Sequence, residues 1–425
     1  MKGYFLATLF VVLSLCGYTQ RTIIHCGKLI DGKNRSVQEQ VSLIIELGRI
    51  SAIEKGYAAA NTGDTLIDLT SKTVMPGLID LHVHIESETN KNQALETFTL
   101  NDADVAFRAA GFARKTLMAG FTTVRDLGGS KVNIALRNAI NQGIAIGPRI
   151  FTAGISIAST GGHADPTNGY RQDLMGDPGP ELGVINSPED ARKAVRQRYK
   201  DGSDLIKITA TGGVLSIAKD GSGPQFTDVE LKAIIETAKD YGMHVAAHAH
   251  GAEGMKRAVL AGVTTIEHGT KMTEEVMDLM KQRGTFYVPT ITAGKFVAEQ
   301  AKIPDYFHPA VVPKALEIGP MIQETFRKAY KRGVKIAFGT DAGVFPHGQN
   351  AKEFGFMVEA GMPAMETILS ATIVNAGILG IADRLGSLEV GKIADVIATD
   401  EDPIQNIHTL ESVSFVMKEG LVYKR

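Results

Sequence analysis

The stretch that decides the fold is MPGLIDLHVH, residues 75–84. Its apolar residues predict a buried strand over 77–85, and alternate side chains of a strand point to the same face. His82 and His84 therefore share one face at the carboxyl end of this strand. Two imidazoles with this spacing form a natural half-site for a divalent metal ion. Taken alone, the His-x-His pattern is a weak signal, because such a pair can equally be structural.

Seven further apolar strand candidates follow, and helical segments separate them. Two helices carry clear start signals: Ser187 precedes Pro188 at a first helical position, and Thr227 with Glu230 forms a capping box. Eight alternating units over roughly 300 residues predict an α/β fold, a parallel (β/α)8 TIM-type barrel. An open doubly wound sheet is the alternative, but no Gly-x-Gly-x-x-Gly follows the first strand. The expected strands cover 77–85, 122–126, 149–155, 205–210, 244–250, 264–269, 286–290 and 334–340.

Residues that can bind metal stand at the ends of three other expected strands. The fifth strand ends in His248 and His250, the sixth contains His268, and Asp341 follows the eighth. Barrel enzymes keep their active sites at the carboxyl ends of the strands, so these side chains converge with the first histidine pair. Each residue alone has a structural explanation, but their joint occurrence at one rim is improbable by chance.

Lys207 lies in the middle of an apolar strand. A buried ammonium group is costly unless it is paired or neutralised. If Lys207 points into the barrel beside two cations, its unprotonated amine could react with carbon dioxide. The resulting carbamate has two oxygens and is suited to bridging two metal ions. A strand at a surface edge is the alternative, which the apolar neighbours on both sides disfavour.

Both ends of the chain predict short strands. Residues 41–46 and 50–53 form a hairpin pattern around Gly48, and similar strand patterns return between 394 and 423. Neither end alone can bury much of a core. We therefore predict one small β-sandwich domain built from residues 21–75 and 384–425, with the barrel over 76–383.

The first twenty residues have the layout of a secretory signal peptide. Their apolar run is shorter than the ~20 residues of a spanning helix, although a short membrane anchor is the alternative. Lipidation of Cys16 is disfavoured by the bulky Leu15. We expect a secreted or periplasmic protein without stable membrane insertion after removal of the leader. Only Cys26 would then remain, so no internal disulfide can form.

The composition excludes several classes of protein. Apolar residues make up 44% of the 425 residues and charged residues 22%, which is ordinary for a globular chain and excludes a disordered or multi-span membrane protein. The net charge is −2, so no basic field points to nucleic acid. The partner expected from the site is a small molecule, and assembly into a homo-oligomer stays open.

The sequence resembles the amidohydrolase superfamily over essentially all of the mature chain. The matching residues are 75–84, 120–126, Lys207, His248, 266–269, 339–341 and the closing turn over 386–395. Within that superfamily the chain is similar to the branch of imidazolonepropionase-related, prolidase-like Xaa-Pro and Xaa-Arg dipeptidases. That similarity is carried by 159–163, 248–254 and 348–353.

The resemblance implies a centre of two divalent metal ions, with zinc as the expected metal. A hydroxide and a carboxylated lysine would bridge the two ions. The implied ligands are His82, His84 and Asp341 for the more buried ion, His248 and His268 for the second ion, and Lys207 as the bridge.

A mechanism follows from such a centre. Two nearby cations lower the pKa of a bridging water, so that hydroxide forms at neutral pH and attacks an amide carbonyl. Asp341 is expected to accept the proton and to deliver it to the leaving amine. His163 and His250 are expected to help hold the tetrahedral oxyanion, the alternative for each being an inert rim residue.

Four other polar residues receive weaker interpretations. Tyr170 and Arg171 lie in a long loop over 164–186 and could meet a peptide carboxylate. Asp126 ends the second strand and is interpreted as a loop anchor. His244 starts its strand at the opposite end and is interpreted as structural.

We predict a metal-dependent hydrolase that cleaves the amide bond of a dipeptide or an N-acyl amino acid, in the manner of a prolidase. Hydrolysis of cyclic amides or lactones, as in imidazolonepropionase, is an alternative. A mononuclear deaminase is disfavoured for two reasons. Such enzymes carry an acidic residue three positions after the histidine of the fifth strand, where this chain has Gly251, and Lys207 is present. A non-catalytic binding protein is disfavoured because no implied ligand is missing.

Overall fold

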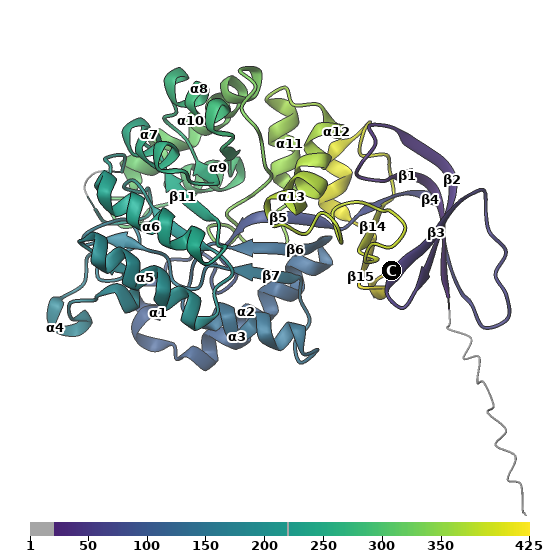
Figure 1. The fold of residues 1–425 in the computed structure, drawn as a ribbon, viewed down its shortest axis with the longest axis horizontal. Helices are drawn as coiled ribbons and strands as arrows, with labels where there is room; N and C mark the ends of the chain where they lie inside the picture. The colour runs from purple at the N-terminus through teal and green to yellow at the C-terminus, as the bar shows by residue number, and fades with distance from the viewer. Residues whose placement is uncertain (1–20, 219–220) are drawn as a thin grey trace, which may run out of the picture.

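The computed structural model describes residues 21–218 and 221–425. The expected leader over 1–20, with Cys16, lies outside the described residues. A barrel with surrounding helices and a smaller sheet at one end make up the molecule (Figure 1). No helix in the described part of the chain combines the length and apolar character needed to cross a membrane.

The predicted barrel is confirmed. Its parallel strands form two runs, β5–β6–β7 and β10–β11–β12–β13, and a bridge between Ile157 and Ile208 joins them. Several strands end earlier than expected, β7 for example at Thr152. The strands are β5 (Leu78–Val83), β6 (Phe121–Asp126), β7 (Arg149–Thr152), β10 (Ile206–Thr209), β11 (Val245–Ala249), β12 (Thr265–His268) and β13 (Phe286–Val288).

The prediction of a regular eighth strand over 334–340 is wrong. This segment forms only an isolated bridge between Ile336 and Tyr287. The side-chain amide of Asn375 donates to the carbonyls of both Ile79 and Phe338, at 2.8 Å each, in place of part of a regular ladder. The segment still closes the barrel, because the Leu81 N–H donates to Phe338 O at 3.0 Å.

The smaller sheet contains strands from both ends of the chain, as expected. Its order is β16–β15–β14–β4–β1–β2–β3, and β4 joins the amino-terminal strands to the carboxyl-terminal ones. Alternating buried residues of these strands form a separate apolar core. The strands are β1 (Thr22–Ile30), β2 (Val37–Glu46), β3 (Arg49–Lys55), β4 (Thr65–Pro76), β14 (Val396–Thr399), β15 (Phe415–Lys418) and β16 (Leu421–Lys424).

Gly77 connects the smaller sheet to the first barrel strand. A Cβ atom at this position would lie 2.2 Å from the hydroxyl oxygen of Thr122, so a side chain does not fit there without rearrangement. The chain can therefore pass directly from β4 into β5, which carries His82 at its carboxyl end. The stretch that decides the fold thus spans the junction between the two parts.

Helices pack around the barrel (Figure 1). The predicted start signals are confirmed: the Ser187 hydroxyl accepts from the Asp190 N–H, and Thr227 and Glu230 form a capping box. The helices are α1 (Gln93–Thr99), α2 (Asp102–Met118), α3 (Val132–Asn141), α4 (Gln172–Met175), α5 (Pro188–Asp201), α6 (Asp228–Asp240), α7 (Ala252–Ala261), α8 (Glu274–Arg283), α9 (Ile291–Gln300), α10 (Val312–Lys331), α11 (Lys352–Glu359), α12 (Ala364–Leu369) and α13 (Asn375–Ile378). Short strands β8 (Ala158–Ser159) and β9 (Val184–Ile185) pair across the long loop after β7.

Candidate metal centre

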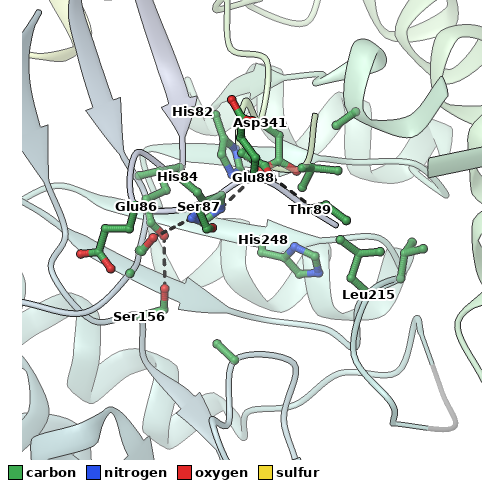
Figure 2. Close-up of a pocket in the computed structure, with 18 of the residues that line it drawn as sticks. His82, His84, Glu86, Ser87, Glu88, Thr89, Ser156, Leu215, His248 and Asp341 are labelled. Carbon is green, nitrogen blue, oxygen red and sulfur yellow. Dashed lines mark hydrogen bonds and ion pairs between the residues drawn. The ribbon is translucent and has the colours of Figure 1, made fainter. Parts of the chain in front are cut away.

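A group of buried ligand atoms lies at the carboxyl ends of the barrel strands. One ligand atom each from His82, His268 and Asp341 lie within 4.8 Å of one another, a grouping that can hold a metal ion. The Oδ1 atom of Asp341 lies 3.4 Å from Nε2 of His82 and 3.3 Å from Nε2 of His84. The Nζ atom of Lys207 lies 3.4 Å from Nε2 of His82. Figure 2 shows several of these side chains facing the same cavity.

Two members of this group have an unusual backbone. His268 has a φ of 68° and Asp341 a φ of 62°, both in the left-handed region that residues with a side chain seldom adopt. Such a conformation costs roughly 1–3 kcal/mol and persists only where the surrounding structure enforces it. The barrel therefore holds these two side chains toward the group at some cost in stability.

The donor atoms fit a metal ion. Metal-binding histidines usually present one ring nitrogen to the metal while the other is held by a carboxylate, a carbonyl or a hydroxyl. Three histidines here have that arrangement, with the Nε2 atom left toward the group. The outer contacts are His82 Nδ1 to Glu267 Oε2 at 2.9 Å, His84 Nδ1 to Gly128 O at 2.7 Å and His268 Nδ1 to Thr290 Oγ1 at 2.8 Å.

The Asp341 carboxylate supports the same interpretation. Its Oδ1 atom is buried and has no hydrogen-bond partner among the described residues. A buried carboxylate oxygen without a partner is unfavourable, and coordination of a cation would satisfy it.

His248 and its neighbours form the second half of the site. The ring of His248 lies 4.6 Å from that of His268 and 4.3 Å from that of His163, centroid to centroid. The Nε2 atom of His248 is 3.2 Å from the Gly212 carbonyl, which leaves Nδ1 as the other possible ligand atom. His250 is fixed by a 2.9 Å contact between its Nδ1 atom and the hydroxyl of Thr270. Thus all eight residues expected at the site line one cavity, although only three form the tight group.

Burial sets the protonation of these groups. It lowers the pKa of the histidines, that of His84 to about 4, so one ring nitrogen of each has a free lone pair at neutral pH. Burial also lowers the pKa of Lys207, which is only 3% exposed, and raises the pKa of Asp341. An amine with a lowered pKa is more readily available in its neutral, nucleophilic form.

A buried charged network supports His82 from behind. The guanidinium of Arg125 donates to Glu267 Oε1 at 2.8 Å, and the other oxygen of Glu267 meets His82. Asp80 accepts from the His82 N–H at 3.0 Å and from the Thr340 hydroxyl at 2.6 Å. These charged residues lie within the motifs at 75–84, 120–126 and 266–269, but the motifs alone predict no role for them. Their occurrence as charged residues inside apolar strands was the available signal.

Asp126 and His244 lie outside the cavity lining. The Asp126 carboxylate accepts from the Ile85 N–H at 2.8 Å and from the Thr152 hydroxyl at 3.0 Å. Asp126 therefore anchors the segment after β5. His244 lies immediately before β11, at the opposite end of the strand from His248.

The ligand group opens into a cavity of about 890 Å³. The expectation that Tyr170 and Arg171 meet a substrate carboxylate does not agree with this cavity, since neither residue lines it. Arg171 instead pairs with Asp173 and is 75% exposed. Among the described lining residues, Arg108 and Lys207 are the only arginine and lysine, and Arg108 pairs with Glu96 at 2.8 Å.

Comparison with known proteins identifies the family. The model of the amidohydrolase family matches residues 73–423. The chain belongs to the amidohydrolase family. This membership confirms the superfamily predicted from the sequence, and it makes the protein a hydrolase that acts on carbon–nitrogen bonds.

Three relatives narrow the comparison. A Xaa-Pro dipeptidase, whose crystal structure has methionine bound in the active site, is 56% identical with a TM-score of 0.93; the alignment covers 96% of this chain and 100% of that one. A prolidase complexed with N-methylphosphonate-L-proline is 31% identical with a TM-score of 0.87 at 96% and 100% coverage. Ochratoxinase from Aspergillus niger is 31% identical over 95% of this chain and 86% of that protein. The prolidase-like branch predicted from the sequence is therefore confirmed.

Proposed function

We propose that this amidohydrolase is a dipeptidase of the prolidase type, which hydrolyses the amide bond of a dipeptide or an N-acyl amino acid. The observation that carries the proposal is the buried group of His82, His268 and Asp341 at the floor of a large cavity. The similarity to a Xaa-Pro dipeptidase over nearly the whole length of both chains supports the choice of substrate.

We propose that the site holds two divalent metal ions, with zinc as the expected metal. Bound there, the ions would activate water and polarise the substrate carbonyl. The proposed ligands are His82, His84 and Asp341 for one ion, His248 and His268 for the other, and a carboxylated Lys207 between them.

Asp341 is proposed as the group that moves the proton. Its carboxylate lines the cavity, so it can accept a proton from the attacking water and later donate it to the leaving amine. The backbone N–H of Asp341 donates to His82 O at 2.7 Å, which fixes the position of this residue beside the histidines.

His163 and His250 are proposed to donate hydrogen bonds to the oxyanion of the tetrahedral intermediate. Both line the cavity beside His248. The Nδ1 atom of His163 is buried without a hydrogen-bond partner among the described residues, so this ring has unused capacity. Donors held in advance stabilise developing charge without reorganisation during the reaction.

Arg108 is proposed to bind the carboxylate of the substrate. It projects from α2 into the cavity, and its side chain is 45% exposed. An arginine can bind a carboxylate through two parallel hydrogen bonds. Arg108 thus takes the role that the sequence suggested for Arg171.

We also propose that residues 1–20 direct export and that the enzyme acts outside the cytoplasm. Detection of the mature protein in a periplasmic or culture fraction, with its first residue determined by mass spectrometry, tests this proposal. An uncleaved chain in the cytoplasm would contradict it.

Hydrolysis of a broad panel of dipeptides and N-acyl amino acids tests the proposed reaction. The protein is loaded with zinc and bicarbonate, its metal content is measured, and the release of free amino acids is followed. We expect rapid release from a subset of the panel, with a clear preference at the carboxyl-terminal position. No release by protein that holds two metals per chain would contradict the dipeptidase proposal and favour cyclic amides or lactones.

A further inference from the structure

The cavity has one strongly apolar wall. Val214 and Leu215 follow β10, Val297 lies on α9, Ile318 lies on α10, and Val344 follows Asp341. These five residues belong to one packed apolar cluster, in which three of them are less than 8% exposed. Side chains from four separate segments thus form a continuous surface next to the proposed catalytic group.

The facing wall is the more polar one. It is formed by the segment after β5, by α1 and by α2, and it holds the charged Glu86, Glu88, Glu96 and Arg108 beside the apolar Val105 and Phe112. Figure 2 shows Leu215 and Glu86 on opposite sides of His248. A bound molecule that spans the cavity therefore meets charged groups on one side and a mainly apolar surface on the other.

Protein contacts hold the apolar wall in place before a ligand binds. The ammonium of Lys314 on α10 donates to the carbonyls of Gly213 at 3.0 Å and Ala218 at 2.9 Å, which fixes the segment that carries Val214 and Leu215. On the other side, a Cβ atom at Gly294 would lie 2.8 Å from Ile322, so α9 can pack closely against α10 only with glycine there. A ligand therefore has little of this surface to order on binding.

The wall also adjoins the catalytic histidines. A Cβ atom at Gly213 would lie 2.2 Å from the ring of His163, and the ring of His163 stacks on His248. Val214 thus directly follows Gly213, which packs against His163. A group on the apolar wall lies beside the position proposed for the oxyanion, close to the scissile bond.

We propose that this wall selects substrates in which one residue or acyl group next to the scissile bond is large and apolar, of the size of methionine, leucine or phenylalanine. This inference rests on the proposed amide-hydrolase function and adds the class of side chain. The cavity of about 890 Å³ lies near the upper end of the ~300–1,000 Å³ range of pockets that enclose drug-sized ligands. A substrate with two small residues would leave the wall uncovered.

The main test uses substrate pairs of equal length and different polarity. Dipeptides and N-acetyl amino acids with Met are compared with those containing Gln, and Leu with Asn, at each side of the scissile bond. We expect kcat/KM to be at least ~10-fold higher for the apolar member at one of the two positions, because apolar pockets discriminate groups by ~10- to 200-fold. Equal or higher values for the polar members at both positions would overturn the proposal.

Two variants test whether the apolar wall causes the preference for apolar substrates. Leu215→Asn introduces an amide into the wall, and the matched Leu316→Asn makes the same change on α10, at a residue that is 44% exposed and not part of the cavity lining. We expect the first variant to reduce the apolar-to-polar ratio at least ~5-fold and the second to leave it unchanged. Should Leu215→Asn fail to fold, Val297→Thr makes a polar change of nearly equal volume. An unchanged ratio in the variant that folds would overturn the assignment to this wall.

A binding measurement tests the role of the apolar wall independently of the proposed hydrolysis. The chain contains no tryptophan, so Phe112→Trp at the cavity lining supplies a single fluorescent reporter outside the apolar wall. The zinc-loaded protein is titrated with N-acetylmethionine and with N-acetylglutamine. If nothing is hydrolysed, at least ~10-fold tighter binding of N-acetylmethionine still supports the wall. Equal binding of the two, or no saturable signal with either, overturns it.

Discussion

The ligand group and the polar wall of the cavity differ in how their side chains are held. His82, His268 and Asp341 are at most 7% exposed, and each ring has a second contact that fixes its orientation. Arg108 in the polar wall is 45% exposed, and its ion-pair partner is also accessible to solvent. The difference teaches that the barrel strands fix the chemistry, whereas the segments that follow the strands decide which substrate reaches it.

The largest effect is expected from Lys207→Ala. The change removes the proposed bridging ligand, so turnover is expected to be abolished and the metal content to fall below two per chain while the barrel stays folded. His248→Ala is expected to behave in the same way, because it removes a ligand of the second ion. Activity, metal analysis and circular dichroism measure the three quantities. Lys200→Ala, at an exposed position on α5, serves as the control. Retention of most of the activity by either ligand variant would contradict the assigned centre.

The next effect concerns the support behind the ligand group. Glu267→Gln weakens the contact to His82 and leaves the fully buried Arg125 without a charged partner. Loss of such supporting groups typically lowers metal affinity by ~10- to 100-fold. Breaking a buried ion pair also costs about 3–5 kcal/mol of the free energy of unfolding. Metal competition and urea denaturation measure the two effects.

The control for that variant is Glu275→Gln, since Glu275 pairs with Lys256 on the surface. We expect it to change metal affinity little and stability by less than about 1 kcal/mol. A Glu267→Gln protein that binds zinc as tightly as the parent would show that His82 is held without this carboxylate.

Much of the fold was predictable because it depends on local patterns. The period of apolar residues indicated the strands, and Ser187 and Thr227 marked helix starts that the structure contains. The irregular form of the eighth strand was not predictable, because the amide of Asn375, distant in the sequence, replaces part of its hydrogen-bond ladder. The left-handed backbone at His268 and Asp341 gave no sequence signal either, since tertiary packing enforces it.

The candidate site was predictable for its strand-end residues but not for its supports. Strand alternation placed His82 and His84 on one face, and the barrel rule brought His248 and His268 to the same rim. The partner of a buried charge depends on which strands become neighbours, so the contact between Arg125 and Glu267 needed the three-dimensional structure. Arg171 does not line the cavity, because loop conformation, not residue type, decides whether a side chain enters it.

Metal removal is expected to loosen the strands that carry the ligand group more than the exposed helix α1. A ligand that binds only the folded state at 100 times its dissociation constant stabilises that state by about 2.7 kcal/mol per site. Treatment with a chelator should therefore lower the free energy of unfolding by about this amount for each ion that is removed. Hydrogen exchange should rise in β5 and β12 and change little in α1. An unchanged stability after measured loss of metal would show that the ligand group is held by protein contacts alone.

The smallest effect is expected from Arg108→Gln. Because this guanidinium is half-exposed and already paired with Glu96, its attraction for a substrate carboxylate is screened by solvent and is worth only about 1 kcal/mol. We expect KM to rise by about 5-fold while kcat stays the same, whereas Arg114→Gln, at an exposed position on the same helix, leaves both unchanged. Dipeptides with an amidated carboxyl terminus provide the decisive comparison. The parent enzyme should prefer the free acid over the amide, and Arg108→Gln should lose that preference. If the variant keeps the full preference, another residue binds the substrate carboxylate. The weakly held side chain that helps to select the substrate would then have to be sought elsewhere in the cavity.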